Sequence, residues 1–177
     1  MITSPTRLAG EIIQIGAVKL DDELQMVDYF CQTIKPVFYR SMNKNVERLT
    51  LITDKDLEEG VSFQNAIHSF KDWCGSDSII LTWGESDIKT LEKNLQIHGL
   101  STDWIPENYD AQWMFDDQVT MEGRRYSLDY ARFKFNVKGK NSHDALNDAC
   151  NTAEVLQHLD VKEWIEEERQ YSDEGYN

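Results

Sequence analysis

Apolar and polar positions follow one another along the chain in a pattern that predicts a mixed α/β fold. Residues 11–21 and 29–36 are rich in β-branched or aromatic side chains and are separated by a short polar turn, so we expect an antiparallel hairpin. Residues 78–84 form a continuous apolar run, which is typical of a central strand covered on both faces. A helical pattern at 87–99 and a further strand at 109–115 follow, and this order predicts a parallel pair with a right-handed crossover.

Helical spacing of apolar residues occupies the intervals between these strands and most of the C-terminal part. Two helices are predicted over residues 53–60 and 62–75, each with a Thr or Ser cap and a terminal Gly. Two more are predicted over 127–135 and 143–159. A narrow seam in the last of these, able to lie close against a sheet, consists of Ala145, Ala149, Ala153 and Leu156. The fold class is therefore α/β, a mixed sheet flanked by helices in a single domain.

Composition agrees with one soluble globular unit. A chain of 177 residues with 40% hydrophobic and 28% charged residues has the size and balance of one domain with one core. No apolar run of about 18 residues and no secretion signal is found, so we expect a cytoplasmic protein that does not enter a membrane. Three scattered cysteines are expected to be reduced and mostly buried.

The net charge of −14 is unusual for a protein that binds nucleic acid, because such proteins commonly carry a basic surface. Part of the acidic excess follows Leu159, where a solvated helix with a frayed end is expected. A local stretch has the opposite sign, and its members are Arg124, Arg125, Arg132, Lys134, Lys138 and Lys140. This stretch is either an ordinary solvated face or part of a surface for phosphates.

Three residues suggest metal chemistry. Asp87 follows the apolar strand by three residues and begins the next helix, so it either complements the helix dipole or binds a cation. Asp148 lies within the alanine seam of the last predicted helix, where a carboxylate turned toward packed structure needs a partner such as a metal. His143 precedes that helix and is either a cap or a general base for water. Asp144 and Asp110 are expected to be structural.

These residues match a known pattern. The chain resembles the DEDDh family of 3′–5′ exonucleases, whose signature H-x-A-x-x-D-A is matched by His143, Ala145, Asp148 and Ala149. Residues 11–21 are similar to the family's second strand and residues 80–91 to its second acidic motif, with a Trp-Gly pair like that of the small RNA-trimming branch. The resemblance covers residues 11–160.

The resemblance implies a ribonuclease H-like fold and a catalytic site made by Asp87, His143 and Asp148. Asp87 and Asp148 would hold Mg²⁺ or Mn²⁺ in a two-metal site, with His143 as general base. The expected substrate is single-stranded nucleic acid with a 3′ end, with RNA slightly favoured, and the products are nucleoside monophosphates. The exonuclease-like domain is expected to span residues 1–170, and residues 171–177 are expected to be an acidic, frayed tail.

The family's first motif, D-x-E on an initial central strand, is not found. Residues 1–10 contain no acidic residue, and Glu11 stands where the family pattern places no ligand. Three explanations remain open: an upstream stretch is missing, another segment replaces the strand, or the chain is a degenerate relative. With Asp87 and Asp148 alone, we expect weak binding of one ion and little or no hydrolysis.

Two other interpretations compete with the enzyme. One is a catalytically inactive module that keeps the exonuclease fold and binds nucleic acid or a protein. The other is a plain acidic interaction protein, based on the net charge and on the aromatic residues Trp104, Trp113 and Trp164. Aromatic residues at such spacing belong more often to a core.

Overall fold

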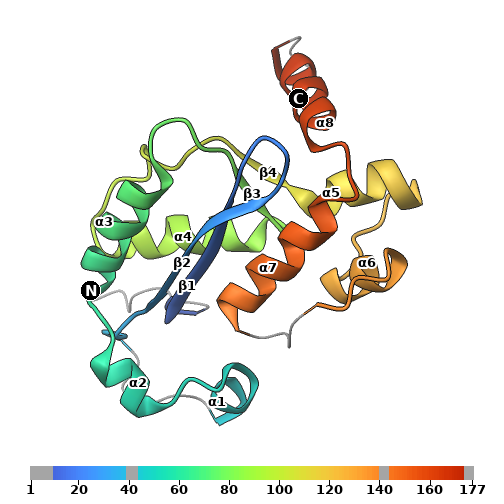
Figure 1. Cartoon of the computed structure of the whole chain (residues 1–177). Helices are drawn as coiled ribbons and strands as arrows, with labels where there is room; N and C mark the ends of the chain where they lie inside the picture. The colour runs from blue at the N-terminus through green and yellow to red at the C-terminus, as the bar shows by residue number, and fades with distance from the viewer. Residues whose placement is uncertain (1–9, 39–43, 140–143, 174–177) are drawn as a thin grey trace, which may run out of the picture.

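The structure is a computed structural model that describes residues 10–38, 44–139 and 144–173 (Figure 1). Within these residues, strands and helices follow one another in a mixed order. The strands are β1 (Gln14–Leu20), β2 (Met26–Thr33), β3 (Ile80–Thr82) and β4 (Asn108–Asp110). The helices are α1 (Lys44–Thr50), α2 (Asp54–Glu59), α3 (Phe63–Cys74), α4 (Ser86–Ile97), α5 (Ala111–Phe115), α6 (Leu128–Lys134), α7 (Ala145–Leu156) and α8 (Val161–Asp173), with a π-helical turn at Asp116–Thr120.

The strands form two small sheets. Strands β1 and β2 are antiparallel, and Gly16 lies opposite Cys31. Strands β3 and β4 are parallel, and Thr82 lies opposite Asp110. The predicted hairpin and the predicted parallel crossover are therefore confirmed. The predicted α/β fold class is confirmed. In the described part of the chain its strands form two separate pairs, β1 with β2 and β3 with β4.

Two strand predictions need correction. The predicted strand over 109–115 ends at Asp110, because the Asp110 carboxylate accepts a hydrogen bond from Gln112 N at 2.8 Å and so caps helix α5. The predicted strand over 78–84 is paired only at Ile80–Thr82, and these three residues are half-buried rather than covered on both faces.

The predicted helices are confirmed, and so are the predicted caps at Thr53 and Ser62. Thr53 and Asp56 form a reciprocal capping box at the start of α2. Ser62 caps α3 and Ser127 caps α6, each through a hydrogen bond from the third backbone N–H of its helix. Local side-chain chemistry thus fixes where these helices begin.

The core consists of two hydrophobic clusters. One joins Phe63 and Ile67 of α3 with Leu91 and Leu95 of α4 and with Ile34 beyond β2. The other joins helices α5 to α8 with the β3–β4 pair, and Met114, Phe115 and Val155 are fully buried in it. Figure 1 shows α3 and α4 on one side of the hairpin and α7 beside it, followed outward by α6.

The tryptophan residues belong to these clusters. Trp164 is buried, and Trp104 and Trp113 pack against the two clusters. The aromatic residues therefore give no support to the plain interaction protein. All three cysteines are free, with Cys74 and Cys150 buried and Cys31 exposed. Among the described residues, no helix is long and apolar enough to cross a membrane.

Helix α7 lies against the hairpin with very little space between them. A Cβ atom on Gly16 would overlap the backbone of Ala145 and Leu146, at distances that real Cβ atoms do not adopt. Ala145 N donates to Gln14 Oε1 at 3.1 Å, which ties the first turn of α7 to β1. The predicted alanine seam does bring its helix close to a strand, and Gly16 is the complementary feature on the strand.

Candidate active site

Asp87 lies where the sequence placed it, in the first turn of α4. The preceding segment turns sharply at Gly84, whose φ of +98° is a conformation that favours glycine. Thr82 Oγ1 donates to Gly84 O at 2.8 Å and stabilises this turn. Strand β3 and the bend at Gly84 therefore fix the position of Asp87, which lies three residues beyond the bend.

Asp148 lies in the first turn of α7. This turn is fixed on two sides, because the Asp144 carboxylate accepts from Asn147 N at 3.0 Å and Gln14 binds Ala145 N. Asp144 is thus the N-cap of α7, which agrees with the structural role expected for it. Asp148 N in turn donates to Asp144 O at 2.9 Å, so the backbone of the candidate ligand is part of a regular helix.

The two carboxylates come within electrostatic range of one another. The pKa of Asp87 is raised, first because nearby protein atoms withdraw part of its hydration and then because Asp148 and Asp110 add negative potential. A hydrogen bond from Ser86 acts in the opposite direction. Asp87 nevertheless keeps access to solvent. An accumulation of negative charge at an accessible position is the environment that a divalent cation prefers.

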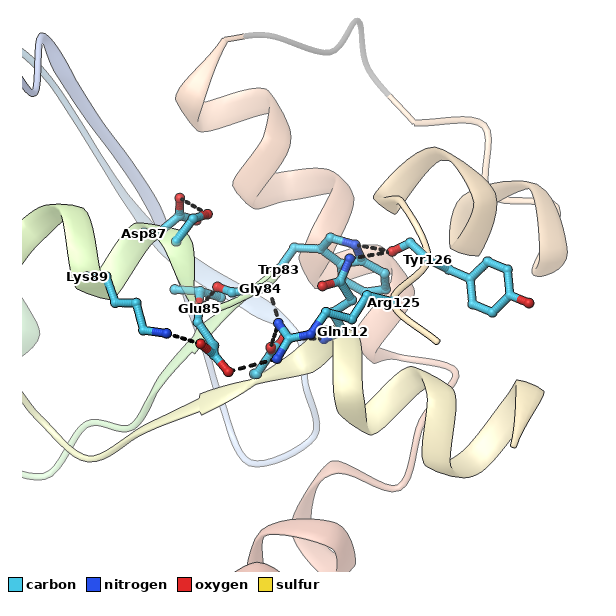
Figure 2. A network of polar contacts seen from close by, with 11 residues as sticks. Trp83, Gly84, Glu85, Asp87, Lys89, Gln112, Arg125 and Tyr126 are labelled. Carbon is cyan, nitrogen blue, oxygen red and sulfur yellow. Dashed lines mark hydrogen bonds and ion pairs between the residues drawn. The ribbon is translucent and has the colours of Figure 1, made fainter. Parts of the chain in front are cut away.

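A network around Arg125 holds the base of this site together (Figure 2). Arg125 Nη1 donates to Asp110 Oδ2 at 2.9 Å and Nη2 to Glu85 Oε1 at 2.7 Å, and the guanidinium lies 4.8 Å from the centroid of the Trp113 ring. Asp110 Oδ1 also accepts from Gly84 N at 3.0 Å. Arg125 therefore connects the bend before Asp87 with the end of β4.

The same loop is fixed by backbone contacts. Trp83 Nε1 and Gln112 Nε2 both donate to Tyr126 O, at 3.0 and 2.7 Å (Figure 2). Glu85, which receives Arg125, is also paired with Lys89, and these two cations lower the pKa of Glu85. Sequence analysis missed these roles, because nothing in the pattern separates Arg125 from its five basic neighbours.

A buried carboxylate shapes the segment that carries Arg125. Asp116 is 2% exposed, accepts from the Thr120 hydroxyl, and receives Glu122 N and Arg124 N at 3.2 Å each. The Thr120 hydrogen bond is the main cause of a lowered pKa at Asp116, and the backbone donors add to it. Asp116 therefore organises the loop from the inside and is not directed at a ligand.

The remaining candidates divide into structural residues and one that is not described. Asp110 is engaged by Gly84, Gln112 and Arg125 and is structural, as predicted. Glu11 receives the backbone N–H groups of residues 37 and 38, which agrees with its exclusion as a ligand. His143 lies outside the described residues.

The donor set fits a hard cation. Asp87 and Asp148 offer carboxylate oxygens, the ligands that Mg²⁺ and Mn²⁺ prefer. Among residues 10–38, 44–139 and 144–173, no group of three His, Cys, Asp or Glu side chains converges as a ready metal site. An ion bound by Asp87 and Asp148 would therefore find no third such side chain among the described residues.

Comparison with known proteins identifies the family of the chain. The family model described as Exonuclease matches residues 5–156. A probable 3′-5′ exonuclease KapD of Bacillus subtilis (strain 168) is 28% identical over 174 residues, covering 95% of this chain and 79% of that protein. A PolC-type DNA polymerase III of Thermotoga petrophila is 32% identical over 147 residues, but the match covers 82% of this chain and only 10% of the polymerase.

Solved structures show the same fold. The nuclease domain of 3′hExo, a DEDDh family member bound to rAMP, has a TM-score of 0.75 at 21% identity, covering 84% of this chain and 80% of that one. The cell-death related nuclease CRN-4 has a TM-score of 0.74 at 17% identity, and the match spans 84% of this chain but 56% of that nuclease. At these identities the likeness establishes the fold.

The fold is the α/β fold of the ribonuclease H-like class. More particularly, the chain belongs to the Exonuclease family, and its recognition from sequence as a DEDDh-type 3′–5′ exonuclease is confirmed. The comparisons support the enzyme, a hydrolase, and give no support to the alternative of an inactive module.

Proposed function

We propose that the chain removes nucleotides one at a time from the 3′ end of single-stranded RNA or DNA, at a metal-dependent site containing Asp87, Asp148 and His143. The observation that carries the proposal is that Asp87 and Asp148, about 60 residues apart in sequence, each lie in the first turn of a helix, α4 and α7, and that the charge of Asp148 helps to raise the pKa of Asp87. Similar proteins include a 3′-exonuclease that recognises a histone mRNA stem-loop and a DNA polymerase, so both substrates are proposed.

In this proposal Asp87 at the start of α4 and Asp148 at the start of α7 would hold a divalent cation. A bound Mg²⁺ or Mn²⁺ would polarise the scissile phosphate and make a water more acidic. His143, in the matched position of the family signature, would accept the proton of the attacking water. Water oxygen would bond to phosphorus as the 3′ oxygen of the preceding nucleotide leaves, and a nucleoside 5′-monophosphate would be released.

Rigid supports would keep the carboxylates oriented. Gln14 and Asp144 fix the first turn of α7, and the Arg125 network fixes the bend that precedes Asp87. Ligands held by packed elements lose little freedom when they bind an ion, which favours both affinity and a constant geometry. These supports favour metal binding at the starts of α4 and α7.

The test is an exonuclease assay on 5′-labelled 12-nucleotide RNA and DNA with Mg²⁺ or Mn²⁺. Because the chain belongs to the Exonuclease family, we expect hydrolysis in spite of the missing D-x-E motif, seen as a ladder of products shortened from the 3′ end. We expect loss of this ladder in Asp87→Asn and Asp148→Asn, and an unchanged ladder in Asp103→Asn, an exposed carboxylate elsewhere. Intact substrates with the unaltered chain, or full activity of Asp148→Asn, would contradict the proposal.

Metal binding gives a second readout that does not depend on turnover. A ligand that binds only the folded state raises the midpoint of thermal unfolding as its concentration rises. We expect Mn²⁺ to raise this midpoint for the unaltered chain and for Asp103→Asn, and to have little effect on Asp87→Asn and Asp148→Asn. Equal shifts of the unfolding midpoint in all four proteins would show that the ion does not bind at Asp87 and Asp148.

A further inference from the structure

Helix α6 presents an aromatic side chain to solvent next to basic residues. Phe133 is 81% exposed, while Ala131 of the same helix is fully buried and Leu128 and Tyr130 pack against the core. Lys134 and Lys138 are also exposed. The outward face of α6 and the segment after it therefore combine one aromatic ring with positive charge.

Local charge distinguishes this segment from the rest of the molecule. Residues 124–139 contain five basic residues and one acidic residue, in a chain whose net charge is −14. Lys134 in the last turn of α6 would complement the helix dipole, which accounts for one cation. The helix dipole explains neither why the ring of Phe133 is exposed nor why a lysine, Lys138, stands beyond the end of the helix.

The position of α6 relative to the candidate site follows from its contacts. Phe135, directly after α6, stacks on His158 beyond the end of α7, with ring centroids 4.8 Å apart and an interplanar angle of 17°. The chain must then return to Asp144 at the start of α7. Lys138 lies on this return path, so the segment leads from the distal end of α7 toward Asp148.

The length of that path corresponds to a short run of nucleotides. Asp148 and His158 are ten residues apart, or roughly 15 Å at a helical rise of about 1.5 Å per residue. Stacked nucleotides advance about 3.4 Å each along a strand. A strand that follows α7 and has its 3′ end at the carboxylates would therefore reach the end of α7, where Phe135 of the same segment stacks on His158, after about four or five nucleotides.

We infer that Phe133, Lys134 and Lys138 form a contact surface for the single-stranded part of a nucleic acid, upstream of the 3′ terminal nucleotide. The ring of Phe133 stacks on a base, and the two lysines bind phosphates. Every base has a π face, so this surface accepts RNA and DNA alike and does not read sequence. The inference rests on the proposed function, because it takes the 3′ end to lie at Asp87 and Asp148.

Binding measured in EDTA tests this surface without turnover. The probes are 5′-fluorescein oligouridylates and oligothymidylates of 2 to 12 nucleotides, followed by anisotropy. The unaltered chain is expected to bind more tightly as the length rises to about five nucleotides. Phe133→Ala is expected to weaken binding of the 12-mers by about 5- to 150-fold, the range measured for loss of base stacking, and to leave the dinucleotides unaffected.

Salt dependence isolates the two lysines. The double variant Lys134→Gln/Lys138→Gln is expected to lower the slope of log affinity against log salt by about 1.4, because each phosphate contact on a single strand contributes about 0.7. Tyr171→Ala, at a tyrosine that is 61% exposed on α8, and Lys55→Gln, on the exposed face of α2, are matched controls and should bind as the unaltered chain does.

Equal affinity of Phe133→Ala, Tyr171→Ala and the unaltered chain for the 12-mers would overturn the inference. The same equal affinities are expected if this face binds a protein instead of nucleic acid, so that case also counts against the inference. Circular dichroism checks that each variant is folded. The failure of the proposed function is seen separately, as absence of hydrolysis by the unaltered chain with Mn²⁺. A chain that binds 12-mers through Phe133 and does not cut them would retain the surface and refute the enzyme.

Discussion

Gly16 of strand β1 packs directly against the backbone of Ala145 at the start of helix α7. The absence of a side chain on Gly16 lets the helix approach the strand, and Gln14 can then bind Ala145 N. This contact sets the position of the first turn of α7, where Asp148 lies. A residue with no chemical function thus controls the placement of a candidate ligand.

Gly16→Ala is therefore expected to destabilise the protein by about 1–3 kcal/mol, the usual effect of overpacking a close contact. Because the added methyl group meets backbone rather than a flexible side chain, helix α7 must shift. Urea denaturation measures the free energy of unfolding. Cys31→Ala, at the exposed residue opposite Gly16 on β2, is the control and should change stability by less than about 0.5 kcal/mol. An unchanged stability of Gly16→Ala would show that the helix contact is looser than described.

Much of this arrangement could be predicted from sequence, and the reasons differ from residue to residue. Caps such as Thr53 and Ser62 were predicted because a side chain and its own backbone decide them locally. The strand over 109–115 was mispredicted because its apolar spacing fits a buried helix equally well, and the cap at Asp110 decides the matter. Gly16 was not singled out, since its role depends on a helix 129 positions later.

Sequence analysis of the site had a similar limit. Asp87 and Asp148 could be proposed because each occupies a recognisable place at a helix start within a family signature. Arg125 could not, because its role comes from its contacts with Asp110 and Glu85, which lie 15 and 40 residues away. Long-range polar networks leave no periodic pattern in the sequence that a reader could detect.

Arg125→Ala is expected to lower the free energy of unfolding by about 1–3 kcal/mol, because the largely buried Asp110 carboxylate loses a charged partner. A double-mutant cycle with Asp110→Asn should give a coupling of at least about 0.5 kcal/mol. Arg124→Ala is the matched control, since its guanidinium is 72% exposed and stands 3.9 Å from Glu122. We expect a change within about 0.5 kcal/mol there. Equal effects at both arginines would show that the network around Arg125 contributes little.

The pair formed by Glu107 and Arg169 predicts a dependence of stability on pH. Two hydrogen bonds from Arg169, at 2.8 and 2.5 Å, with a further one from Tyr109, lower the pKa of Glu107 from 4.5 to about 2. A carboxylate whose pKa is lowered by folding contributes stability that is present above its unfolded value and is lost as pH falls toward the folded value. The loss attributable to this pair is therefore expected between about pH 4.5 and pH 2.

The measurement is the difference in stability between the unaltered chain and Glu107→Gln as pH is lowered. We expect this difference to be largest above pH 4.5 and to shrink toward pH 2. Its size should be modest and should fall with added salt, because both side chains are more than 40% exposed. A difference that stays constant from pH 6 to pH 2 would show that the contribution of Glu107 to stability does not depend on its charge.

Asn94 provides the last prediction, because it is a buried amide that joins α4 to the segment before β1. It is 2% exposed, its Oδ1 accepts from Ile12 N at 3.1 Å, and its Nδ2 donates to Gly10 O at 3.3 Å and Thr90 O at 2.9 Å. Asn94→Ala leaves the Ile12 N–H without this acceptor in a partly buried place. Such a loss is expected to lower the free energy of unfolding by about 1–3 kcal/mol.

A matched variant separates the hydrogen bonds of Asn94 from its volume. Asn94→Leu keeps a similar side-chain size and removes every polar atom, so it should be at least as destabilising as Asn94→Ala if the amide contacts matter. Asn108→Ala is the surface control, since Asn108 is exposed and its amide binds Pro106 O two residues away. This variant should change stability by less than about 0.5 kcal/mol. Hydrogen exchange at Ile12 gives a local readout, and we expect faster exchange in both Asn94 variants. If Asn94→Leu were as stable as the unaltered chain, packing around α4 rather than the amide would hold the segment before β1 in place.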